Sequence, residues 1–237
     1  MKAMILAAGL GTRFKPWTDK HPKALAVVNG KSLLQRNVEY LQSAGIYDVV
    51  VNVHHFADQI ESAITENKGW GSHIQVSDER DVVLETGGGL MKAQPYLDGE
   101  PFVLMNVDVL TTLDLPAMIA SHQKLMPLAT LATTKRKSSR YFLFDHLGNL
   151  CGWKHQGTGE EKIVRIAADL VPAAFSGIHV IDPSIFRLVK QTGKFSMVDV
   201  YLSLAHENVI KSFDHTGTSF VDVGKPESVV VAESLFK

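Results

Sequence analysis

The 237-residue chain contains 45% hydrophobic and 21% charged residues, a composition typical of a globular protein with a large buried core. Its net charge of −1 argues against binding to nucleic acid or to an anionic membrane. No apolar run reaches the roughly 18 residues of a membrane span. The single cysteine, Cys151, rules out an intrachain disulfide and favours a reducing compartment. We therefore expect a single cytoplasmic domain without a signal peptide.

The first 25 residues combine a buried strand with a glycine turn and two cations. The apolar run Ala3–Ala8 is typical of a strand in a parallel sheet. Residues 9–13, GLGTR, follow it, and their two glycines allow the backbone N–H groups to approach a ligand closely. Such clustered N–H groups bind anions, above all phosphate. Together with Arg13 and Lys23, this pattern predicts a polyphosphate site.

Three other interpretations of this stretch are weaker. A dinucleotide-binding G-x-G-x-x-G turn fails because Phe14 occupies the third glycine position. A P-loop ending in Gly30-Lys31-Ser32 fails because Leu25 stands at its first glycine, and Ser32 is better explained as a helix N-cap. A solvated basic loop without a ligand remains open.

The next segments alternate between helix and strand. Helical periodicity covers residues 32–44 and 57–67, whereas residues 47–53 and 74–77 are short apolar strands. This alternation predicts a doubly wound, mainly parallel sheet.

A run of three glycines, Gly87–Gly89, lies in the segment 84–90 and leads into a helix through Met91, Ala93 and Leu97. Successive glycines let a ligand come close to the backbone, and the helix N-terminus behind them adds positive potential. We expect a ligand-binding turn here, with a flexible hinge as the alternative.

The apolar strand 101–107 ends at Asp108. Ligands of open α/β sheets bind outside the carboxyl ends of the strands, so this carboxylate is expected to face the same crevice as the glycine loop. A turn-forming aspartate is the plainer alternative. Asp114, before Leu115-Pro116, is interpreted as a helix N-cap.

The second half contains more strands and turns. Residues 128–133 form a predicted strand, and residues 141–145 and 150–153 form a predicted hairpin. The basic run 135–140 between them is interpreted as a solvated loop.

Two helices are expected to follow, over residues 182–191 and 197–207. The strand 219–222 then repeats the pattern of Asp108, because it ends in Asp222 before a glycine. A last helix begins at Pro226.

Two motifs of the opening stretch resemble those of the sugar-1-phosphate nucleotidylyltransferases. Residues 6–16, LAAGLGTRFKP, are similar to the family pattern L-A-A-G-x-G-T-R-x-x-P, and residues 22–25, PKAL, are similar to P-K-P-L. The chain departs from the family at Ala24, where proline is usual, and at Trp17, where leucine is usual. Neither change removes a charged group.

This resemblance implies an α/β, three-layer Rossmann-like fold, with a mixed, mainly parallel sheet and a small strand-rich sugar-binding subdomain. It implies one domain over residues 1–237, with a nucleotide-binding half (1–127) and a sugar-binding, metal-completing half (128–237). Arg13 and Lys23 are the implied catalytic residues, and Asp108 and Asp222 the implied Mg²⁺ ligands. The implied nucleotide-binding residues are Leu6, Ala7, Ala8, Gly9, Gly11, Thr12, Arg13, Lys23 and Glu79. The implied sugar-binding residues are Glu85, Thr86, Gly88, Asn106, Ser176 and Gly177.

The implied reaction is Mg²⁺-dependent transfer of a nucleotidyl group from an NTP to a sugar 1-phosphate, by a monomer or homodimer. The sequence 85–89, ETGGG, is similar to the form in the N-acetylmuramic acid and mannose-type members, which favours UTP and an N-acetylmuramate-type sugar. A mannose-1-phosphate guanylyltransferase-like enzyme, a cytidylyltransferase acting on an alcohol phosphate and a non-catalytic nucleotide sensor are the alternatives.

Overall fold

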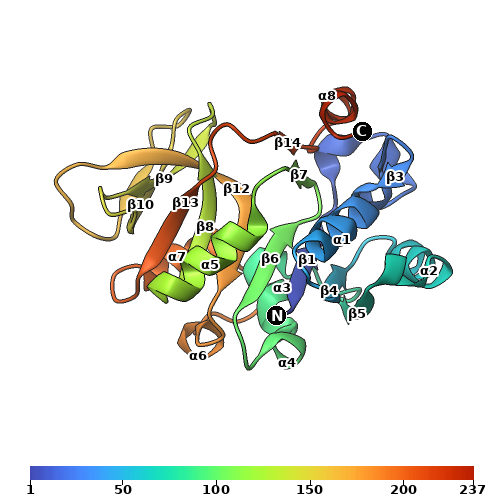
Figure 1. Cartoon of the computed structure of the whole chain (residues 1–237), viewed down its shortest axis with the longest axis horizontal. Coiled ribbons are helices and arrows are strands. Elements are labelled where there is room, and N and C mark those ends of the chain that lie inside the picture. Colours follow the sequence, from blue (N-terminus) through green and yellow to red (C-terminus); the bar gives the residue numbers. More distant parts are fainter.

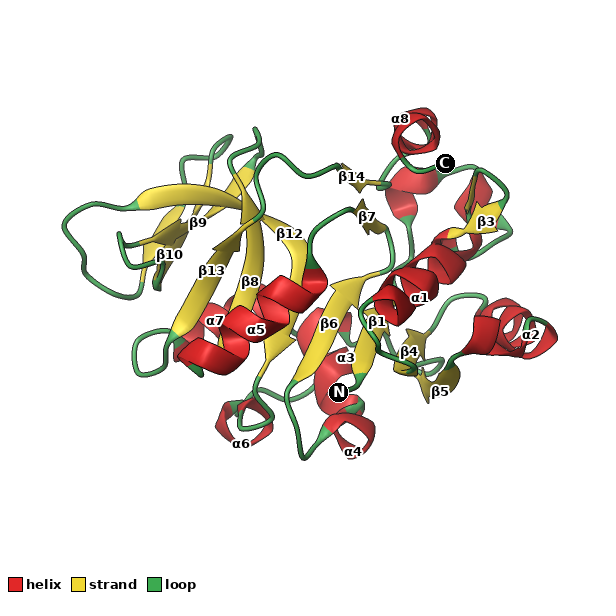
Figure 2. Ribbon diagram, in the orientation of Figure 1, coloured by secondary structure: helices red, strands yellow, loops and turns green.

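The computed structural model describes residues 1–237 as a mixed central sheet with helices on both faces (Figures 1 and 2). The strands are β1 (Ala3–Leu6), β2 (Val27–Val28), β3 (Lys31–Ser32), β4 (Asp48–Val53), β5 (His73–Asp78), β6 (Phe102–Asn106), β7 (Val109–Thr111), β8 (Ala129–Thr134), β9 (Arg140–Phe144), β10 (Leu150–His155), β11 (Glu161–Ile163), β12 (Val171–Ile181), β13 (Ile210–Asp214) and β14 (Phe220–Asp222). The α-helices are α1 (Leu33–Ser43), α2 (Ala57–Glu66), α3 (Glu85–Lys92), α4 (Gln94–Leu97), α5 (Leu115–Leu125), α6 (Ile185–Leu188), α7 (Met197–Leu204) and α8 (Glu227–Leu235). The predicted three-layer α/β fold is confirmed.

The N-terminal half of the sheet is parallel. β1 lies between β4 and β6, and β5 extends the sheet beyond β4. Because all four strands run in the same direction, their carboxyl ends meet at one edge, where parallel sheets hold ligands.

The C-terminal half of the sheet is mainly antiparallel, and the long strand β12 joins its parts. One end of β12 pairs with β6 and β8, and its other end pairs with β9. β9, β10 and β11 then form the outer antiparallel region at the left of Figure 1. This region is the strand-rich part that the sequence predicted.

Two apolar cores fill the layers on either side of the sheet. Ala3 and Ile5 face the core formed with α1, α2 and α5, whereas Met4 faces the core formed with α3, α4, α6 and α7. A third, smaller core joins Phe14 of the glycine loop to β14 and α8. The glycine loop is thereby anchored to the C-terminal segment.

Local details largely follow the sequence. Ser32 and Asp114 are the N-caps of α1 and α5, accepting hydrogen bonds from the amides of Gln35 and Ala117. The helix expected over residues 182–191 is wrong in length, because α6 covers a single turn and Val189 is already extended. None of the helices combines the length and apolar character needed to cross a membrane.

His179 on β12 is a buried titratable group far from the glycine loop in the sequence. Its Nδ1 forms a 2.6 Å hydrogen bond with the hydroxyl of Tyr201, and its ring packs edge-on against Phe175. Burial lowers the pKa of His179 to about 3. The native protein therefore keeps this imidazole neutral.

We predict that acid weakens the fold through His179. In the unfolded chain this histidine takes up a proton near pH 6.5, whereas in the folded chain it does so only near pH 3, so stability is lost as the pH falls through that window. Between pH 7 and 5 the loss from this group is about 2 kcal/mol. Urea unfolding at both pH values should therefore give a smaller pH dependence for His179→Gln than for the wild type. Equal dependences would contradict this assignment.

Candidate active site

The glycine loop after β1 lines a cavity of about 490 Å³ at the carboxyl edge of the parallel strands. This wall includes most of the residues predicted to bind the nucleotide, namely Leu6, Ala7, Ala8, Gly9, Gly11, Thr12 and Lys23. We call this space the first cavity.

The loop backbone offers free donors to this cavity. The amides of residues 8–11 donate no hydrogen bond within the protein, whereas the amide of Ala7 donates to Asn52 Oδ1 at 2.7 Å. Gly11 has a positive φ of 61°, and a Cβ there would lie 2.8 Å from Thr18 Cγ2. This glycine is therefore needed for the turn, and the free amides suit an anion.

Two carboxylates and three cations gather beside the loop. Lys23 Nζ donates to Asp108, and both side chains are more than four-fifths buried. The pKa of Asp222 is raised, first by its partial removal from water and then by the negative charge of Asp108. The cations of Lys23, Arg13 and Arg136 act in the opposite direction. We refer to these five residues as the charged cluster.

A short strand pair explains why the two carboxylates meet. β7 begins at Val109 directly after Asp108, and it pairs antiparallel with β14, so that Val109 lies opposite Asp222. The amide of Val223 also donates to the carbonyl of Asp108 at 2.8 Å. The sequence predicted that both aspartates end strands, and the structure brings them together through this pair.

A second cavity, of about 560 Å³, lies on the other side of the charged cluster. Arg13 and Asp222 line it, together with the side chains Ser138, Ser139, Arg140, Tyr141, Phe142, Trp153, Phe175 and Val198. Lys23 and Asp108 line the first cavity. The cluster therefore stands between two separate spaces.

Arg136 corrects the expectation of a solvated basic loop over residues 135–140. Its guanidinium donates to the carbonyls of Ala174 and Phe175, at 3.1 and 2.8 Å, and lies 4.5 Å from the centre of the Phe220 ring. Burial lowers its pKa, while Asp222 raises it. The aromatic residue two places before Asp222 was the signal in the sequence for this buried cation.

The triple glycine corrects another expectation, because Gly87–Gly89 lie within α3 and not in a turn before it. All three are buried, and they pack against protein instead of an open space. A Cβ at Gly88 would lie 2.2 Å from the carbonyl oxygen of Gly193, and one at Gly89 would lie 2.7 Å from Glu79. The glycines serve close packing, and Gly88 lines neither cavity, so its contact with a sugar stays a prediction.

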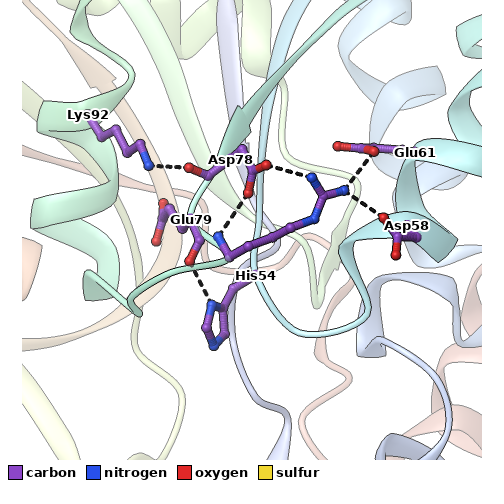
Figure 3. Close-up of polar contacts among 7 residues, drawn as sticks. His54, Asp58, Glu61, Asp78, Glu79 and Lys92 are labelled. Carbon is purple, nitrogen blue, oxygen red and sulfur yellow. Dashed lines mark hydrogen bonds and ion pairs between the residues drawn. The ribbon is translucent and has the colours of Figure 1, made fainter.

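Glu79 does not face the ligand space as predicted. It is 1% exposed and accepts hydrogen bonds from Asn52 at 2.7 Å and from the amide of Leu84 at 3.3 Å. Burial raises its pKa. The same Asn52 holds the amide of Ala7, and His54 bonds the Glu79 carbonyl at 2.7 Å (Figure 3). Glu79 thus supports the cavity wall from behind.

The end of β5 and the residues after it are tied to α2 by ion pairs and to α3 by a hydrogen bond (Figure 3). The Arg80 guanidinium contacts Asp58 and Glu61 at 2.8 Å and Asp78 at 2.6 Å. Lys92 also donates to the carbonyl of Asp78. These exposed pairs contribute little free energy singly, but together they position the chain that leads to the first cavity.

The residues predicted to contact sugar separate into two groups. Asn106 lines the first cavity, and Gly177 makes room for it, since a Cβ at that glycine would lie 2.8 Å from Asn106 Nδ2. Ser176 is 1% exposed and bonds His215 Nε2 at 2.8 Å. Neither Ser176 nor Gly177 lines the first or the second cavity, and their contact with a sugar stays a prediction.

Glu85 and Thr86 line the first cavity beside two residues that the sequence analysis missed, Lys194 and Ser196. Lys194 Nζ lies 3.5 Å from Glu85 Oε1. The amide of Met197 donates to Thr86 Oγ1 at 2.8 Å. Residues 194 and 196 reach the cavity only because this segment pairs with α3, and no local motif indicated that contact.

Residues 2–143 match the nucleotidyl transferase family. The chain is 31% identical to N-acetylmuramate alpha-1-phosphate uridylyltransferase of Caulobacter vibrioides, over 98% of this chain and 95% of that protein. It is 29% identical to mannose-1-phosphate guanyltransferase of Yarrowia lipolytica, over the whole chain and 64% of that protein. The structure of HddC from Yersinia pseudotuberculosis complexed with GMP-PN superimposes with a TM-score of 0.80 at 25% identity, covering 100% of this chain and 99% of that one.

We predict that Gly88→Ala destabilises the protein. The new Cβ would meet the Gly193 carbonyl, and the roughly 1–3 kcal/mol cost of overpacking exceeds the ~1 kcal/mol gain in helix propensity. Gly9→Ala is the matched control, because a Cβ there meets nothing within 4 Å, and its stability should change by less than about 0.5 kcal/mol. Urea unfolding measures the free energy of unfolding of both variants. An unchanged value for Gly88→Ala would indicate that segment 193–195 moves to accommodate the new Cβ at no cost.

Proposed function

Because the chain belongs to the nucleotidyl transferase family, we propose that it transfers a uridylyl group from UTP to a sugar 1-phosphate of the N-acetylmuramate type. The observation that carries this proposal is the charged cluster, which stands between two cavities. A reaction that joins two anionic substrates needs a place for each and fixed charges between them. We assign the nucleotide to the first cavity and the sugar phosphate to the second. This assignment places Glu85, Thr86 and Asn106, which the sequence predicted to contact the sugar, on the nucleotide side.

In the proposed reaction, an oxygen of the sugar phosphate attacks the α-phosphorus of UTP. The bond from that phosphorus to the pyrophosphate oxygen breaks, and the products are the UDP-sugar and pyrophosphate. The protein needs to align the reactants and offset their negative charge, and no side-chain nucleophile is required.

The cluster and the loop provide these effects. The free amides of residues 8–11 would hold the triphosphate. Arg13 would donate paired hydrogen bonds to phosphate oxygens as charge develops, and Lys23 would act as a point charge. We propose both as the catalytic residues.

Asp108 and Asp222 suit a magnesium ion. Mg²⁺ prefers oxygen ligands and is usually bound by one or two carboxylates with substrate phosphates and water completing the shell. No group of three or more histidine, cysteine or acidic side chains forms a metal centre by itself, which agrees with a site that the substrates complete. When bound, the ion would neutralise phosphate charge and orient the phosphates.

The choice of base and sugar rests on the Caulobacter relative, which aligns over nearly all of both chains. Guanylyl transfer to mannose 1-phosphate is the second candidate, favoured by the Yarrowia relative and by the GMP-PN complex. A cytoplasmic location and a monomeric or homodimeric state are part of the proposal, the former because of the lone Cys151.

The direct test incubates the protein with Mg²⁺, each NTP and a panel of sugar 1-phosphates, and measures pyrophosphate. We expect the highest rate with UTP and N-acetylmuramate 1-phosphate. A faster reaction with GTP and mannose 1-phosphate would select the second candidate. Tight nucleotide binding without pyrophosphate from any pair would favour a nucleotide sensor.

We predict that Asp108→Asn folds but loses turnover, because the amide keeps the volume of the side chain and removes the charge that would hold the metal. The value of kcat/KM should fall by at least about 100-fold, measured well below the Tm, which itself should fall because buried Lys23 loses its partner. The control is Asp114→Asn, since asparagine is an equally good helix N-cap, and its activity should match the wild type. A near-normal rate of Asp108→Asn at limiting Mg²⁺ would exclude Asp108 as a ligand.

We also expect Arg13→Lys to lose about tenfold or more in kcat/KM, because lysine lacks the planar fork that bonds two phosphate oxygens at once. Lys20→Arg, at an exposed position in the same segment, should leave the rate unchanged. Steady-state kinetics of both variants are the measurement, and full activity in Arg13→Lys would reduce Arg13 to a surface charge.

A further inference from the structure

The second cavity is lined by one arginine that does not belong to the charged cluster, Arg140. Two arginines line it, Arg13 and Arg140, and neither guanidinium forms an ion pair or hydrogen bond within the chain. By contrast, Arg136 and Arg165 are satisfied by backbone carbonyls, and Arg80 by carboxylates. Arg13 belongs to the charged cluster, where the proposed reaction places the sugar phosphate. Arg140 lies outside the charged cluster, is exposed and has no internal partner, so its guanidinium is free to meet an anion.

The surroundings of Arg140 suit an anion. Arg140 begins β9 and lies opposite His155 of β10. The Nδ1 atom of His155 accepts hydrogen bonds from the amides of Gly157 and Thr158, at 3.1 and 3.0 Å. Lys154, on the same strand pair, lies 6.0 Å from the Tyr141 ring. Of the acidic residues, only Asp222 lines this cavity, and it belongs to the charged cluster.

The rest of the wall suits a sugar ring. Trp153, Tyr141 and Phe175 offer aromatic surface, which covers the apolar faces of a ligand, and Ser138 and Ser139 offer hydroxyl groups. An aromatic and hydroxyl-lined space with two unpaired guanidinium groups fits a sugar that bears two separate anionic groups. One is the phosphate beside Arg13, and the other is free to meet Arg140.

We propose that Arg140 binds a carboxylate on the sugar, so that the acceptor is an acidic sugar 1-phosphate. A guanidinium and a carboxylate match in plane and pair through two hydrogen bonds, which makes Arg140 a residue that determines specificity. This inference rests on the proposed function for the identity of the reaction, but it assigns a separate feature of the substrate. N-acetylmuramate carries such a carboxylate on its lactyl group, and N-acetylglucosamine is the same sugar without it.

The test compares N-acetylmuramate 1-phosphate with N-acetylglucosamine 1-phosphate, by calorimetric binding and by pyrophosphate release with UTP. The wild type should prefer the acidic sugar. Arg140→Gln should lose roughly 10- to 100-fold in affinity and kcat/KM for the acidic sugar and less than about twofold for the neutral one. For the acidic sugar, the affinity and kcat/KM of Arg140→Lys should lie between those of the wild type and Arg140→Gln. Lys137→Gln is the control, because Lys137 is exposed in the same loop and lines neither cavity.

Each outcome decides a separate point. Equal losses for both sugars in Arg140→Gln would overturn the inference, because Arg140 would then hold the phosphate that the two share. Equal binding of the two sugars by the wild type, or binding of neither, would also overturn it. Selective, Arg140-dependent binding without pyrophosphate would support the inference and contradict the proposed reaction. An unchanged Tm in Arg140→Gln is expected, since its guanidinium has no internal partner.

Discussion

The pairing of β7 with β14 is the constraint on which the candidate site depends. β14 has no other strand partner, and this pairing places Asp222 opposite Val109 and thus beside Asp108. A shift of one residue in this register would turn Asp222 to the opposite face of the strand. The third core, which packs Phe14 against Val221 and Val223, fixes the glycine loop to the same pair. One short ladder therefore sets the positions of the loop and of both carboxylates together.

The charged cluster is balanced within the protein. Lys23 pairs with Asp108, and Arg136 lies near Asp222 while its guanidinium also bonds backbone carbonyls. Leaving a buried charge without a partner costs several kcal/mol, roughly, so this balance lets the fold form without substrates. Arg13 and the free loop amides are the groups that remain available for an anion.

The sequence predicted those parts of the site that are encoded locally. The strand and glycine loop, the N-caps at Ser32 and Asp114 and the strand end at Asp222 follow from neighbouring residues and are where the sequence placed them. Asp108 lies in the turn between β6 and β7. Apart from the length of α6, the errors concern contacts between distant segments. The glycine run 87–89 and the buried Arg136 both have a local pattern of open, polar chain, but each packs against a segment dozens of residues away. The spacing of apolar residues within a segment does not show which distant segment it packs against.

The contact between α3 and segment 193–197 links the two halves of the first cavity wall. The amides of Gly87 and Gly88 donate to the Phe195 carbonyl, and the amide of Phe195 donates to Leu84. These bonds make two stretches, distant in sequence, into a single module of the cavity. Exchange of this wall of the first cavity with that of a relative would need to transfer residues 84–89 and 193–197 as a unit. In recombination between family members, crossover points that separate these stretches would divide a matched pair, even where each stretch alone has a well-aligned counterpart.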